Sequence, residues 1–196
     1  MARMTRGFTY LGLLFAGFLL AACTTTPEPS YYVLGSYTER SGEPGRTDPS
    51  GTVIGLRELA LPLYARRTQI ASVGADGAIS LSDDHRWAED PPRAVSRVVA
   101  RTLTELTGQA VVIEPWPVGV EPDIRVDIEV DYFAGTLGGD LRLSGQYRIV
   151  RKNGASPVTQ AFSISERSAE DSFASLVESH TRALQALAGR VSAEIR

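Results

Sequence analysis

The feature that most constrains the fold is an alternation of apolar and polar side chains in the second half of the chain. Residues 123–132 alternate between apolar and mostly charged side chains, and residues 141–149 repeat the pattern after a glycine-rich turn. A third β-prone segment, residues 158–165, follows the turn signal Lys152-Asn153-Gly154. Because successive side chains of a strand point to opposite faces, these segments predict an antiparallel meander with one apolar face. That apolar face needs a second layer to cover it.

Two amphipathic helices are predicted to supply this layer. Asp90-Pro91-Pro92 is typical of a helix start, and Gly108 stands where a C-terminal glycine ends a helix. A second helical stripe runs through residues 170–196. The fold class is therefore predicted to be α+β, a two-layer domain with a largely antiparallel or mixed sheet and two amphipathic helices on one face. Its remaining strands are expected at residues 31–37, 52–61, 66–73, 78–82 and 110–114.

The first residues of the chain have the pattern of a signal peptide rather than of the domain. Arg3 and Arg6 precede an uncharged apolar run, residues 8–22, which is short for a membrane-spanning helix of roughly 20 residues. The run ends in Leu20-Ala21-Ala22-Cys23, which resembles the lipobox of bacterial lipoprotein signal peptides. An uncleaved anchor helix with an incidental cysteine is the alternative.

The lipobox resemblance implies that the Cys23 sulfur carries a diacylglycerol and that cleavage makes Cys23 the first residue. The expected organisation is a lipoprotein signal peptide (1–22), an acylated tether (23–30) and a single domain (31–196). Extended, the tether reaches about 25 Å at most. By analogy with lipoprotein sorting, Thr24 in place of Asp indicates the outer membrane, with the domain facing the periplasm.

Composition excludes several classes of function. Cys23 is the one cysteine of the chain, which excludes an intramolecular disulfide and every multi-cysteine metal site. A net charge of -3 argues against a nucleic-acid binder held by phosphate contacts. His85 is expected in a solvated loop rather than a metal site, and His180 in the core or at its boundary rather than as a catalytic base. No catalytic motif or cofactor fingerprint is present, so neither an enzyme nor a cofactor is expected.

The aromatic side chains are the better candidates for contacts with a partner. Trp87 and Trp116 either close the core between helix and sheet or lie exposed at an interface, where Trp and Arg are enriched. The apolar segment of residues 59–64 is either packed or in contact with a partner or lipid. The sequence leaves these alternatives open.

In order along the chain, these motifs resemble the PqiC/YmbA-type lipoproteins, the auxiliary lipoprotein component of ABC-type transport systems. The resemblance rests on the lipobox, Tyr31-Tyr32-Val33-Leu34, Val53-Ile54-Gly55-Leu56, Leu61-Pro62-Leu63-Tyr64, Arg67-Thr68-Gln69-Ile70, Arg86-Trp87-Ala88-Glu89 and Pro115-Trp116. Thr68 and Asp90 depart from the family pattern, which has proline at both places. Six residues within these motifs are candidates for binding a partner: Leu63, Tyr64, Arg67, Gln69, Arg86 and Trp87.

The resemblance implies a non-enzymatic docking subunit that helps to move phospholipids between the inner and outer membranes. The implied partners are an MCE-domain protein and, with it, an ABC ATPase and a permease. Two other functions stay open: direct lipid binding in a groove between helices and sheet, and regulation of a cell-envelope enzyme. An exposed edge strand near Tyr31 could also pair between subunits in a homo-oligomer.

Overall fold

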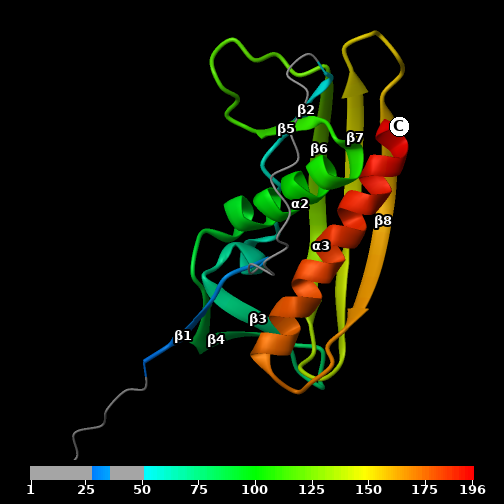
Figure 1. Ribbon diagram of the computed structural model, residues 1–196. Helices are drawn as coiled ribbons and strands as arrows, with labels where there is room; N and C mark the ends of the chain where they lie inside the picture. Colours follow the sequence, from blue (N-terminus) through cyan, green and yellow to red (C-terminus); the bar gives the residue numbers. More distant parts are fainter. Residues whose placement is uncertain (1–27, 36–50) are drawn as a thin grey trace, which may run out of the picture.

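The computed structural model describes residues 28–35 and 51–196, so the predicted signal peptide and Cys23 lie outside the described residues. The described part is a mixed sheet of eight strands with two long α-helices and one short 3-10 helix (Figure 1). In chain order the elements are β1 (Ser30–Tyr32), β2 (Val53–Leu56), η2 (Leu63–Arg66), β3 (Gln69–Val73), β4 (Ile79–Trp87), α2 (Pro91–Thr107), β5 (Ala110–Ile113), β6 (Ile124–Gly135), β7 (Asp140–Arg151), β8 (Val158–Arg167) and α3 (Phe173–Ile195).

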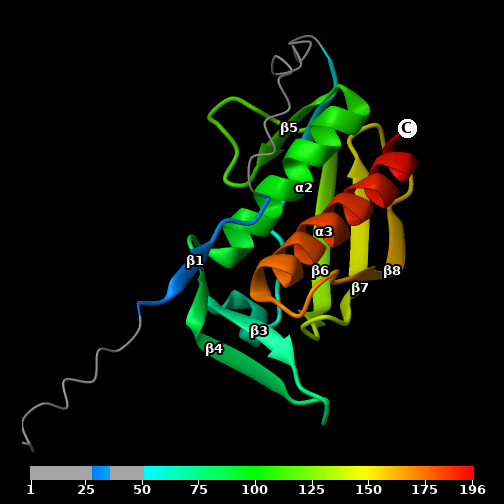
Figure 2. The same ribbon diagram turned by 60° about the horizontal axis from the view of Figure 1, so that its bottom comes forward.

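Strand β6 organises the sheet because it has three neighbours. Along one edge it pairs with β7, and β7 pairs with β8, which confirms the predicted antiparallel meander. Along the other edge its first residues pair in parallel with β2, which also pairs with β5. The end of β6 meets β3 at Ser72 and Gly135. We call β1, β3 and β4, which extend from this end, the arm (Figure 2).

Helices α2 and α3 pack side by side and cover one face of the sheet (Figure 1). Asp90 caps α2 through the Arg93 N–H, prolines occupy its first positions, and Gly108 ends it with a left-handed φ of 69°. Their apolar stripes meet the inward side chains of β6, β7 and β8 in one core. The predicted α+β class and the placement of both helices are therefore confirmed. None of the helices in the described ranges is both long and apolar enough to cross a membrane.

The first half of the chain differs from the prediction. The predicted strand at residues 52–61 ends at Leu56, after which the chain runs beside β6 and returns to it at Ala60 and Glu129. The β4 strand continues to Trp87, whereas the predicted strand ended at Ser82 and His85 was expected in a loop. It does so because long-range partners continue it: β1 pairs in parallel with residues 85–87, and Gln69 lies opposite Arg86. The partner in β1 lies more than fifty residues away in the sequence and leaves no local pattern.

Candidate partner-binding site

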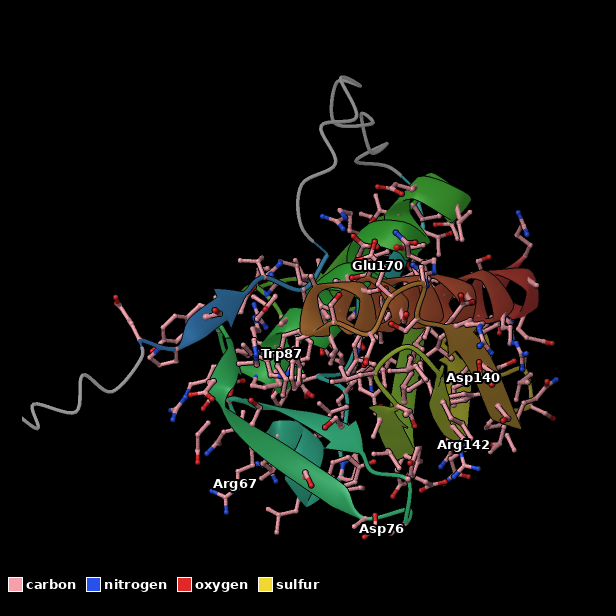
Figure 3. The ribbon with its side chains drawn as sticks, turned by 90° about the horizontal axis from the view of Figure 1, so that it is seen from below. Arg67, Asp76, Trp87, Asp140, Arg142 and Glu170 are labelled. Carbon is pink, nitrogen blue, oxygen red and sulfur yellow. The ribbon has the colours of Figure 1, made fainter. Side chains whose placement is uncertain are left out.

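The structure brings the six candidate partner-binding residues together where η2, β3 and β4 meet. Gln69 lies opposite Arg86 in the sheet, and the N–H of Trp87 donates to the carbonyl of Thr68 over 2.7 Å. Helix η2, with Leu63 and Tyr64, ends one residue before Arg67. Figure 3 shows Arg67 reaching outward from the arm, while Trp87 lies among other side chains.

Tyr64 has a structural contact inside this cluster. Its hydroxyl oxygen accepts a hydrogen bond of 2.8 Å from the backbone N–H of Phe133, in the stretch of β6 between its contacts with Ala60 and with β3. Burial raises the pKa of the Tyr64 hydroxyl. Its ring meets Tyr132 edge-on, and Arg142 stacks over Tyr132 at 4.3 Å. On the edge of β6 that faces away from β7, no described strand pairs with it at Phe133, so the Tyr64 hydroxyl takes the place of a backbone partner for the Phe133 N–H. This matters because an unpaired buried N–H is costly.

Trp87 and Gln69 also face inward, where they line a small cavity with His180. The cavity has a volume of about 20 Å³, room for about one water molecule. The ring of Trp87 contacts the ring of His180 edge-on at 5.4 Å, and Phe133 contacts the same ring at 4.6 Å. Trp87 thus joins the arm to α3 through an aromatic cluster.

Three of the six candidate residues have side chains that reach solvent, and they differ in how exposed they are: Leu63, Arg67 and Arg86. Leu63 is 73% exposed and Arg67 is exposed, with no ion pair to any other described residue. Arg86 is half-buried, and its guanidinium donates to the Asp83 carbonyl at 3.1 Å and lies 3.8 Å from the Asp83 carboxylate. Leu63 and Arg67 are consequently the two candidates that a partner could reach without a change in the fold.

The two histidines have structural contacts. The ring of His85 stacks on Phe173 at 4.0 Å and shares a hydrogen bond of 3.0 Å with the Tyr32 hydroxyl, so the expectation of a solvated loop was wrong. His180 is buried, as predicted, and its Nδ1–H donates to the Leu176 carbonyl over 2.8 Å. Within residues 28–35 and 51–196, no three His, Cys, Asp or Glu side chains are placed to hold a metal ion.

The pKa of His180 makes the fold sensitive to acid. Burial lowers this pKa from 6.5 to about 4, so the folded protein favours neutral imidazole. The stability that neutral His180 contributes is complete above pH 6.5 and is lost as the pH falls from 6.5 to about 4. We expect this loss to be about 1.4 kcal/mol per pH unit and roughly 3 kcal/mol in all.

Urea unfolding of the wild type and of His180→Gln between pH 4 and 7.5 measures this effect. The carboxylates titrate equally in both proteins, so the wild type should lose about 3 kcal/mol more than the variant over this range. Equal losses in the two proteins would contradict the assignment to His180.

Trp116 is the other tryptophan whose burial the sequence left undecided. It lies at the opposite end of β6 from the arm. Its ring packs on the outer face of the sheet over Gly55, with the Arg125 guanidinium 5.2 Å from the ring centroid. Gly55 and Arg125 are partners in the register of β2 and β6. A Cβ at residue 55 would overlap the Pro122 ring, at 2.5 Å from its Cγ, and would lie 3.1 Å from Cε2 of Trp116.

The fold and these contacts define a class of small α+β domain, in which two helices back one face of a mixed sheet. Solved structures share it. A crystal structure of an uncharacterized protein is 15% identical, with 87% of this chain and 100% of that chain covered at a TM-score of 0.69. Protein XCC0632 from Xanthomonas campestris, assigned to DUF330, is 13% identical, with 84% and 90% covered at a TM-score of 0.59.

The family model "ABC-type transport auxiliary lipoprotein component" matches residues 32–192. The chain therefore belongs to this family, which confirms the resemblance in the ordered motifs. A comparison with curated proteins finds no match.

Proposed function

We propose that the protein is a non-enzymatic lipoprotein of the outer membrane, anchored through acylated Cys23 with its domain in the periplasm. It would act as the docking subunit of an ABC/MCE-type system that moves phospholipids between the two membranes. The family match over residues 32–192 carries this proposal, since the members of this family are auxiliary lipoprotein components of ABC-type transport. The lipobox at residues 20–23 supports the anchor.

The segment Ser30–Gly35, which we call the strap, supports the role of a rigid docking domain. The N–H of Ala88 donates to the Tyr32 carbonyl over 2.8 Å, and Leu34 is buried in the core. The N–H of Gly35 donates to Thr181 of α3 over 3.2 Å. The tether therefore joins the domain at a defined place, strand β1 of the arm, within about 25 Å of the predicted acyl group.

Direct lipid binding has less support. The apolar cavity beside Trp87 and His180 holds about 20 Å³, whereas pockets for small molecules occupy roughly 300–1,000 Å³. A phospholipid chain would need the helices to part from the sheet across a close-packed core. The described residues thus favour docking over carriage of lipid by this domain.

The partner surface that we propose includes Leu63 and Arg67. We expect the double variant Leu63→Asp/Arg67→Glu to reduce co-purification of the MCE-domain protein of the same system at least tenfold. The change removes an exposed apolar contact and reverses a charge without entering the core. The measurement is the MCE protein recovered per tagged lipoprotein from detergent extracts.

A matched variant, Ala193→Asp/Arg190→Glu, introduces the same two acidic residues and the same charge change on the exposed side of α3 and should leave recovery unchanged. If the wild type with its acyl group fails to recover an MCE protein, the docking function itself is wrong. If both variants recover it like the wild type, only the assignment of Leu63 and Arg67 is wrong.

A further inference from the structure

An uncharged segment lies in the loop between β5 and β6, flanked by Glu114 and Glu121. Residues 115–120, Pro-Trp-Pro-Val-Gly-Val, carry no charge, and Val118 is fully exposed (105%), the most exposed large apolar side chain among the described residues. We call residues 117–120 the tip. We propose that the tip inserts into an apolar pocket on the protein partner, as a contact separate from Leu63 and Arg67. This inference rests on the proposed docking function.

The tip is held rigidly by its base. Trp116 lies over Gly55 and under the Arg125 guanidinium, and its buried Nε1 has no hydrogen-bond partner among the described residues. Packing and the cation–π contact therefore hold the ring in place. The Arg93 guanidinium adds a hydrogen bond of 3.2 Å to the Glu114 carbonyl where the loop begins.

The tip itself is a closed turn. The N–H of Val120 donates to the Pro117 carbonyl over 3.0 Å, and Gly119 adopts a φ of 81°, which suits glycine. Val118 thus stands at the apex of a turn whose ends are fixed. A preformed turn loses little conformational entropy on binding, so an exposed apolar side chain on it suits a protein pocket.

The position of the tip indicates that it contacts a protein rather than the bilayer to which the domain is anchored. The loop leads into the start of β6, where Ile54 pairs with Ile124, while the arm and the strap lie at the other end, where Ser72 meets Gly135. The twelve residues of β6 separate these ends by roughly 35 Å. Figure 1 shows the loop beside β5 at the top and β1 at the lower left. The tip therefore lies away from the tether's exit.

Photocrosslinking in cells tests this contact. A benzoylphenylalanine replaces Val118 in the full, acylated chain, and in a matched control it replaces Ser156, an exposed residue in the turn at the same end of the sheet. We expect an adduct from residue 118 to the MCE-domain protein and none from residue 156. Val118→Asp should lower co-purification of that protein about ten- to a hundredfold, since it places a charge in an apolar pocket. Because Val118 is fully exposed, the chain should keep its stability.

The outcomes separate this inference from the docking function. Without an adduct at residue 118, or with equal adducts at 118 and 156, the tip contact is wrong, whether or not the wild type recovers an MCE protein. An adduct at 118 to another identified envelope protein, whose recovery Val118→Asp lowers, keeps the tip contact and overturns the MCE partner. Unchanged recovery with Val118→Asp overturns the tip contact even where an adduct forms.

Discussion

Cys23→Ala is expected to abolish both incorporation of radiolabelled palmitate and recovery of the protein with membranes. The sulfur of Cys23 is the predicted attachment point of the diacylglycerol, and no other cysteine is present to replace it. A single acyl chain gives only marginal binding, with an association constant of about 10⁴ M⁻¹, and two chains anchor a protein stably. Loss of the acylated residue should therefore move nearly all of the protein to the soluble fraction.

Thr24→Ala serves as the control for this experiment. It changes the residue next to the cysteine, keeps the apolar run and the Leu20-Ala21-Ala22-Cys23 motif, and should incorporate label like the wild type. Label that persists in Cys23→Ala would show that the lipobox interpretation is wrong. An unlabelled wild type would favour the uncleaved anchor helix instead.

Gly145→Ala is expected to lower the free energy of unfolding by at least about 3 kcal/mol or to prevent folding. Gly145 lies opposite Val130 in the pairing of β6 with β7, where β6 has an irregularity between Val130 and Tyr132. A Cβ at residue 145 would overlap the carbonyl oxygen of Glu129 and lie 2.9 Å from the Cα of Val130. These are backbone atoms in the centre of the sheet, so no side-chain rotation relieves the overlap. Urea unfolding followed by circular dichroism measures the change.

Gly189→Ala, the same chemical change at another place, is expected to raise the free energy of unfolding instead of lowering it. Gly189 lies inside α3, and a Cβ there would have no neighbouring atom within 4 Å. Alanine has a higher helix propensity than glycine, so this variant should gain about 0.5–1 kcal/mol. If the two substitutions changed the free energy of unfolding by similar amounts, β6 and β7 would not approach each other as closely at Gly145 as described.

The parts of the fold that the sequence predicts well are those with a local physical signature. Helix α2 lies within one residue of its predicted limits because Asp90, the two prolines and Gly108 act on neighbouring backbone groups. The β6–β7–β8 meander follows from alternation and short turns. Each signal is complete within about twenty residues, so no distant partner is needed to interpret it.

The arm and the candidate site lacked such a signal. The end of β4 becomes a strand because β1, more than fifty residues away, pairs with residues 85–87. Sequence motifs grouped Tyr64, Trp87 and Gln69 with Leu63 and Arg67, but their side chains point in different directions. Tyr64 turns inward to the N–H of Phe133, and Trp87 to the ring of His180. The sequence left open whether Trp116 is packed or exposed, and nothing local indicated that Trp116 packs while Val118 projects.

The sequence by itself determined the two helices, the meander, the α+β class and the family, because periodicity, caps and ordered motifs are written in neighbouring residues. Only the tertiary structure decided which aromatic side chains are buried, where the strap fixes the tether and which end of β6 carries the exposed tip. The physical reason is that burial depends on the backbone that passes alongside. For Trp116 that backbone is Gly55, and for Tyr64 it is Phe133, both about sixty residues or more distant in sequence.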